Sequence, residues 1–245
     1  MDPLHHFHLH PIIHLPHIGP IDPSINIAVI SMWIATAAVF VLFFLASRKV
    51  SLVPKGIQNL VEVIVQFVRD DIVLTMMGKE GLPYLPFILT LFMFIWFCNL
   101  VGLIPGLFTP TSNIFVTGTL AIMVFFATHI IGIVKHGPFK YFKGWVPQGV
   151  PKALAPALFI IEIPSAFAKP FSLAVRLFAN MLAGHIALLI FLSLIIQFKS
   201  LIIAPAPVLG AVIILILELL FTLLQAYIFA MLSALYISDA VHGGH

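Results

Sequence analysis

The sequence predicts an all-α, polytopic membrane protein. Of its 245 residues, 61% are hydrophobic and only 9% are charged, whereas a soluble domain carries about 25% charged residues. Apolar stretches recur along the chain, each long enough to cross a bilayer core of roughly 30 Å. We therefore expect about five membrane-embedded helices and one amphipathic surface helix, with too few polar residues for a separate soluble domain.

Composition and motifs also argue against several functions. The formal charge of +3 is small and spread among loops, so nucleic-acid binding has no support. The one cysteine, Cys98, lies in an apolar run, which excludes an intrachain disulfide and a thiolate metal site. No Gly-rich Lys motif for phosphates is present. We expect no metal site, no cofactor and no directly bound nucleotide.

Residues 1–24 are rich in His and Pro and contain no Lys or Arg. Clustered His can bind zinc or copper, but no Cys or carboxylate lies at a fixed ligand spacing, and Pro11 and Pro16 interrupt any helix. The segment also lacks the pattern of a cleaved signal peptide or a mitochondrial targeting peptide. We expect an external tail that carries His5, His6, His8, His10, His14 and His17.

Residues 25–245 are expected to form a single membrane domain, which begins with a span at 25–47. Arg48 and Lys49 follow this span, so its end is predicted to be cytoplasmic and the N-terminus to lie outside. Residues 54–76 have apolar positions at helical spacing and polar residues on the other side. This pattern favours an amphipathic helix in the membrane surface, with a polar-faced spanning helix as the alternative.

Two further spans are predicted at 83–104 and 114–134. The connection between them has no charge and is interpreted as external, whereas the next loop is lysine-rich and is interpreted as cytoplasmic. Gly102 and Gly106 form only a weak signal for close helix contact.

The last two apolar stretches, 152–196 and 203–238, are much longer than the roughly 20 residues that cross a bilayer. We expect strongly tilted helices, with two shorter helices as the alternative for the first stretch, where Pro164 and Pro170 are potential kinks. The predicted alternation of sides places the C-terminus in the cytoplasm.

Arg176 lies deep within the first of these stretches. A charge at bilayer depth costs roughly 2.5–3.5 kcal/mol on insertion scales, so it marks a functional site by default. Asn180 follows four residues later on the same helix face. Glu162, Lys169 and Arg176 are spaced by seven and form one polar stripe. The alternative is that Lys169 snorkels to a headgroup and Glu162 marks a helix start.

Folding the two long stretches into an antiparallel pair about residue 201 sets Arg176 level with Gln225 and His185 level with Glu218. Glu and His can accept and release protons, whereas Arg is a permanent cation. The set therefore suggests gated proton transfer. On an ideal helix His185 points away from Arg176, so either the helix is distorted near Gly184 or His185 belongs to a different lining.

These residues resemble subunit a of the F-type ATP synthase, the stator half of its proton motor. The resemblance covers nearly all of the chain from about residue 25. It is carried by three segments: R-L-F-A-N-M-L-A-G at Arg176–Gly184, L-Q-A-Y-I-F at Leu224–Phe229 and N-L-V-G-L-I-P-G at Asn99–Gly106.

The resemblance implies roles for the polar set. The two long helices would cup a rotating ring of c subunits, and Arg176 would face the carboxylates of that ring. One half-channel, open to the outside, would be lined by Asn180, His185, Glu218 and Gln225. The route to the cytoplasm would pass Glu162, Lys169 and Ser172. Some bacterial members exchange the His and Glu positions, which leaves open whether His185 or Glu218 titrates.

Further partners implied by the resemblance are the peripheral-stalk b subunits, the other ATP synthase subunits and the lipid bilayer. The expected location is a bacterial plasma membrane, with the mitochondrial inner membrane as the alternative. A competing interpretation is a self-contained ion channel or secondary transporter. Such transporters often contain two similar halves, and no convincing internal repeat is present here.

Overall fold

The computed structural model describes residues 11–13, 25–48, 53–104, 107–145, 154–198 and 205–242. Within these ranges the chain is almost entirely helical, which confirms the predicted all-α class. Five of the described helical stretches are long and apolar enough to cross a membrane: Ile27–Ser47, Ile57–Gly102, Ile114–His136, Ala157–Phe191 and Pro205–His242.

The first long helix, α1 (Ile27–Ser47), is capped by Asn26, whose side chain accepts a hydrogen bond from the backbone N–H of Val29 at 3.1 Å. This cap satisfies one of the free N–H groups at the start of the helix. Before it, β1 (Pro11–Ile13) pairs antiparallel with β2 (Ile25–Asn26), a short ladder that the sequence did not indicate. The clustered histidines predicted in the external tail lie outside the described residues.

The segment predicted as one amphipathic helix is helical but not uniform. Residues 54–76 contain α2 (Ile57–Phe67), the π-helical η2 (Val68–Leu74) and most of α3 (Thr75–Met77). The 3₁₀-helical η3 (Gly78–Tyr84) then leads into α4 (Leu85–Gly102). Val68, Ile72 and Val73 of η2 are fully buried in the main core, whereas Arg69 and Asp70 are exposed. The predicted amphipathic character is therefore present, and its position in the membrane surface stays a prediction.

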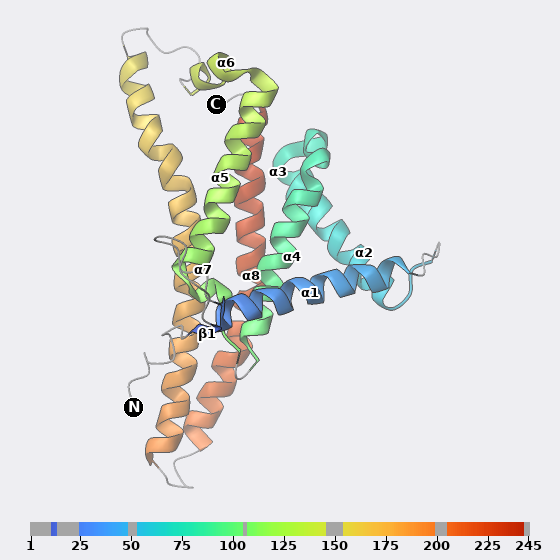
Figure 1. Cartoon of the computed structure of the whole chain (residues 1–245), viewed down its shortest axis with the longest axis vertical. Coiled ribbons are helices and arrows are strands. Elements are labelled where there is room, and N and C mark those ends of the chain that lie inside the picture. Colours follow the sequence, from blue (N-terminus) through green and yellow to red (C-terminus); the bar gives the residue numbers. More distant parts are fainter. Residues whose placement is uncertain are drawn as a thin grey trace.

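Two long helices, α7 (Ala155–Phe198) and α8 (Pro205–His242), run antiparallel along the longest dimension of the molecule, with α5 (Ile114–His136) beside them (Figure 1). Helix α7 is continuous through Pro164 and Pro170, so the alternative of two shorter helices is excluded. With 44 and 38 residues, the two helices are about 66 and 57 Å long.

These lengths agree with strong tilt. Helix α1 has 21 residues, so its length of about 31 Å matches an upright crossing of the bilayer core. In Figure 1, α1 runs across the direction of α7 and α8. Helix α5, with 23 residues, is also of spanning length but runs beside α7 and α8, so the tilt of the two long helices stays a prediction.

The core lies where α4, α5, α7 and α8 meet, around large buried side chains such as Phe92, Leu177 and Phe229. Helix α8 contributes small residues at intervals of four: Ala226, Ala230 and Ala234, all fully buried. Small residues on one helix face permit the close backbone approach that holds membrane helices together. They form an alanine stripe that fixes α8 within the bundle.

Candidate functional site

The first polar site lies between the two long helices. The ring nitrogen Nδ1 of His185, on α7, is hydrogen-bonded to Oε1 of Glu218, on α8, and the Glu218 side chain is only 4% exposed. Gly184 makes room for this approach, because a Cβ atom there would lie 3.1 Å from Glu218 Oε1. The predicted proximity of His185 and Glu218 is confirmed.

A third element reaches the same histidine. The segment 107–113, which contains η4 (Pro110–Ser112), folds inward, and Thr109 and Thr111 are fully buried. The Thr109 hydroxyl is hydrogen-bonded to His185 Nε2. The sequence indicated only an uncharged connection here. Because the segment carries no charge, burying it costs little once its polar groups are paired.

Asn99 of α4 links this segment to α8. Its side chain is 1% exposed; its Oδ1 accepts a hydrogen bond of 2.5 Å from Thr111, and its Nδ2 donates one of 3.3 Å to the Thr222 carbonyl. Asn99 thus joins three elements around the histidine. We call the set Asn99, Thr109, Thr111, His185 and Glu218 the His–Glu site.

Sequence reasoning gave no role to Asn99 or to the threonines. The sequence feature that could have pointed to them is Asn99, a polar residue within an apolar run, followed ten residues later by Thr109 in a charge-free loop. The position of the loop against His185 depends on its fold, which periodicity does not report.

Arg176 and Gln225 differ sharply in exposure. Arg176 is exposed on α7, Asn180 is half-buried, and Gln225 is 4% exposed on α8. Among the described residues no carboxylate forms an ion pair with Arg176, and the buried Nε2 atom of Gln225 has no hydrogen-bond partner. Arg176 is thus more exposed than His185, whose side chain is 20% exposed, and whether the two share a lining stays open.

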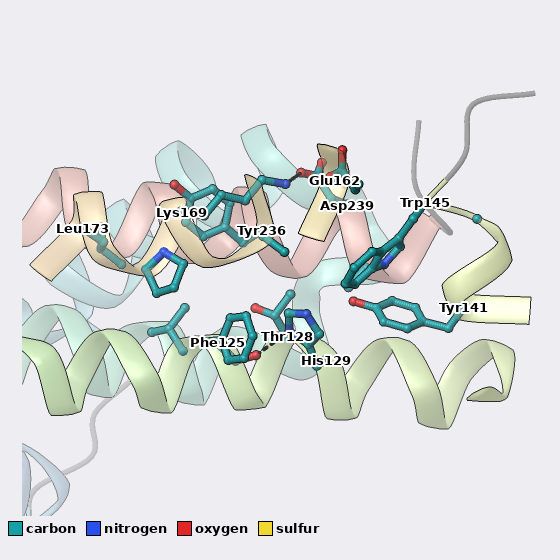
Figure 2. Close-up of a pocket in the computed structure, with 15 residues that line it drawn as sticks. Phe125, Thr128, His129, Tyr141, Trp145, Glu162, Lys169, Leu173, Tyr236 and Asp239 are labelled. Atoms are coloured by element: carbon teal, nitrogen blue, oxygen red, sulfur yellow. Dashed lines mark hydrogen bonds and ion pairs between the residues drawn. The ribbon is translucent and has the colours of Figure 1, made fainter. Parts of the chain in front are cut away.

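A second polar site is a cavity of about 80 Å3 between α5, α7 and α8, which we call the α5–α7–α8 cavity. Lys169 lies in its wall, 3.9 Å from Asp239 Oδ2 and over the Tyr236 ring at 5.7 Å from its centroid. Figure 2 shows Glu162 near this pair and an aromatic wall opposite. The wall is formed by Phe125, His129, Tyr141 and Trp145.

The cavity contains two of the three residues that were predicted to line the route to the cytoplasm. Glu162 and Lys169 line it, but Ser172 is exposed on α7 and does not. Asp239 and Tyr236 were missed. They lie near the end of the last apolar stretch, where a carboxylate and a tyrosine are common in surface positions, so their type alone gave no signal.

No group of three or more His, Cys, Asp or Glu side chains within the described ranges is arranged to hold a metal ion. Cys98 is buried and free.

The fold and these sites define a multi-pass, all-α membrane protein with polar side chains between two long antiparallel helices. Residues 29–238 match the family model of the ATP synthase A chain. The chain is 41% identical to ATP synthase subunit a of Nitrobacter winogradskyi, with all of both chains covered. It is also 41% identical to that of Parvibaculum lavamentivorans, with 100% of this chain and 95% of the relative covered.

A third relative, ATP synthase subunit a of Magnetococcus marinus, is 42% identical over 99% of this chain and 93% of its own length. The family match spans most of the chain and includes the His–Glu site. The chain belongs to the ATP synthase A chain family.

Proposed function

We propose that the chain is the proton-translocating stator subunit of an F-type ATP synthase, which couples proton flow to rotation of a ring of c subunits. Family membership supports its place in the membrane sector of the complex. In this proposal Arg176 faces the carboxylates of the ring, and two aqueous half-channels reach it from opposite sides of the membrane.

The observation that carries the proposal is the exposure of Arg176 on a helix in a membrane protein. A guanidinium does not release its proton, and a permanent charge facing lipid is costly. Within the described residues Arg176 has no carboxylate partner of its own. A carboxylate on a neighbouring subunit would complete the pair, and a rotating ring would supply such carboxylates in turn.

A fixed cation facing a series of acids can do two things. It favours the ionised form of each arriving carboxylate, because an opposite charge within about 4–6 Å stabilises that form. It also blocks a proton from passing directly between the half-channels, since it cannot itself act as a carrier. Proton release and the barrier to leakage would then be properties of one side chain.

The half-channel open to the outside would contain the His–Glu site together with Asn180 and Gln225. His and Glu exchange protons, and Asn and Gln bind water as donor and acceptor. The unpaired Nε2 atom of buried Gln225 is consistent with a water or partner group at that position. The route to the cytoplasm would pass Lys169 and Glu162 in the α5–α7–α8 cavity, with Ser172 on the exposed side of α7.

The remaining parts of the proposal follow from the same role. One charge that crosses the membrane potential gains about 2.3 kcal/mol per 100 mV, so several protons are needed for each ATP, which suits a rotating ring. This chain would bind no nucleotide and would contact peripheral-stalk b subunits. It would lie in a bacterial inner membrane, with the N-terminus outside and the C-terminus in the cytoplasm.

The test is Arg176→Ala in the assembled complex. We expect ATP-driven proton pumping by inverted membrane vesicles to be lost while the amount of assembled complex stays near that of the parent. The matched control is Arg69→Ala, because Arg69 is also exposed but pairs with the adjacent Asp70 at 2.8 Å. Normal pumping by Arg176→Ala vesicles would refute the proposed function.

A further inference from the structure

The buried segment 107–113 places a hydroxyl group on the far side of the His185 ring from Glu218. We propose that Thr109 is a positioning residue for proton transfer, whose hydroxyl holds the His185 ring against Glu218 and pairs with Nε2 in both protonation states of the ring. This inference rests on the proposed function, because it assigns a role within the half-channel open to the outside.

The geometry fixes the ring at both nitrogens. Nδ1 is hydrogen-bonded to Glu218 on α8, and Nε2 is hydrogen-bonded to Thr109. Rotating the ring would break both hydrogen bonds in a place where Thr109 is fully buried and Glu218 is 4% exposed. A ring held at both ends therefore keeps one nitrogen directed at the carboxylate.

The hydroxyl suits this position because it can donate or accept. When the ring is neutral with its proton on Nδ1, that N–H donates to the Glu218 carboxylate, and the bare Nε2 accepts from the Thr109 O–H. When Nε2 gains a proton, the ring becomes a cation with two N–H donors. The Thr109 hydroxyl then turns, and its oxygen accepts from Nε2–H. The hydroxyl thus changes from donor to acceptor toward Nε2 and keeps its own proton.

Thr109 is held in place by groups other than His185. Its carbonyl accepts hydrogen bonds from Ser112, at 3.0 Å from the backbone N–H and at 2.8 Å from the hydroxyl. Thr111, two residues after Thr109, is hydrogen-bonded to Asn99. Gly102 of α4 leaves the space that Thr109 fills, because a Cβ atom there would lie 1.7 Å from Thr109 Oγ1. The segment 107–113 is thus packed against α4, and Thr109 is held in position by contacts that do not involve His185.

The surroundings of the ring contain few other groups that titrate. Among the described residues, the titratable side chain in contact with His185 is Glu218, from α8. The α4 side contributes Asn99, which does not titrate, while Cys98 packs in a cluster with Ala35 of α1. A substitution at Thr109 should therefore change proton uptake through its effect on the His185–Glu218 pair.

The experiment compares Thr109→Val with Thr109→Ser. Valine keeps the shape of threonine but neither donates nor accepts, so Nε2 loses its partner in both protonation states. The charged ring loses more, because hydrogen bonds to charged groups are stronger than those between neutral groups. We expect the external pH that gives half-maximal ATP synthesis to fall by about one unit, because more protons are needed to charge the ring. Serine keeps the hydroxyl and should leave this pH unchanged.

The matched control is Thr117→Val, since Thr117 is equally buried and its hydroxyl bonds to the Ile114 carbonyl of its own helix. Rates are expressed per assembled complex, and Thr109→Ala provides a second variant without the hydroxyl if Thr109→Val assembles poorly. An unchanged pH profile in the hydroxyl-free variant, or an equal shift in Thr109→Ser, would overturn the inference.

The two proposals fail separately. Loss of pumping in Arg176→Ala together with a normal pH profile in Thr109→Val would leave the proposed function standing and refute the role of Thr109. Normal pumping in Arg176→Ala would refute the proposed function itself, whatever the Thr109 variants do.

Discussion

The two polar sites of this chain are built in opposite ways. In the His–Glu site, buried side chains from α4, α8 and the segment 107–113 and the partly buried His185 of α7 are hydrogen-bonded to one another. In the α5–α7–α8 cavity, Lys169 and Asp239 are about one-third exposed and separated by 3.9 Å. The first site is therefore intolerant of change, whereas water can replace interactions in the second.

This difference matters for proton movement. The His185–Glu218 pair should exchange protons only when its geometry is kept, because Glu218 is 4% exposed and an unpaired polar group in a buried position is costly. An open cavity of about 80 Å3 can hold several water molecules, each with alternative partners. Substitutions should thus have large effects at the His–Glu site and small effects at the cavity.

The largest expected effect is that of Glu218→Gln. Glutamine keeps the shape of the side chain but cannot take up a proton, so ATP synthesis should fall by at least about 100-fold, the lower range for loss of a positioned acid or base. The measurement is ATP synthesis by inverted vesicles at fixed proton-motive force. Glu80→Gln is the control, because Glu80 is exposed and pairs with Lys135 at 2.7 Å. A loss below threefold at Glu218 would remove the contrast between the two sites.

An intermediate effect is expected for Gly102→Ala. The new Cβ atom would lie 2.8 Å from the Thr109 Cα atom, so the backbone of the segment must shift, at a cost of about 1–3 kcal/mol. Both the thermal stability of the complex and ATP synthesis should decrease, the latter severalfold. Gly118→Ala is the matched control, since its Cβ atom would meet nothing within 4 Å. Equal behaviour of the two variants would show that the segment is not tightly held.

The smallest effect is expected for Asp239→Asn. A partly exposed ion pair contributes at most about 1 kcal/mol, and water in the cavity can solvate Lys169 after the change. ATP synthesis should fall less than threefold, measured in the same vesicles with Lys135→Gln as a control for loss of an exposed ion pair. A loss above tenfold would mean that Asp239 itself carries protons, and the two sites would then be alike in their sensitivity.

Much of the fold followed from hydropathy and helical spacing. The spans and the two long helices were predictable because apolar length reports membrane embedding directly. The antiparallel pairing of those helices, with one estimated turn position, was enough to place His185 beside Glu218. Both inferences use only distances along the chain.

The site residues that could not be predicted depend on contacts that distance along the chain does not determine. Thr109 reaches His185 because a charge-free loop folds inward over Gly102, and the same loop on the surface would have an equally plain sequence. Asp239 reaches Lys169 only because α5, α7 and α8 come together around the cavity. The exposure of Arg176 is also a property of the packed bundle, since an arginine in an apolar run can face either protein or a partner.

The alanine stripe of α8 has a mechanical consequence. If a ring turns against α7 and α8, the reaction to its torque pushes these helices sideways. Ala226, Ala230 and Ala234 sit within the bundle with no long side chains that could bend. Such a contact has little compliance, so the load would pass into the neighbouring helices instead of being absorbed as sliding at the interface, and each step of the ring would meet the same rigid support.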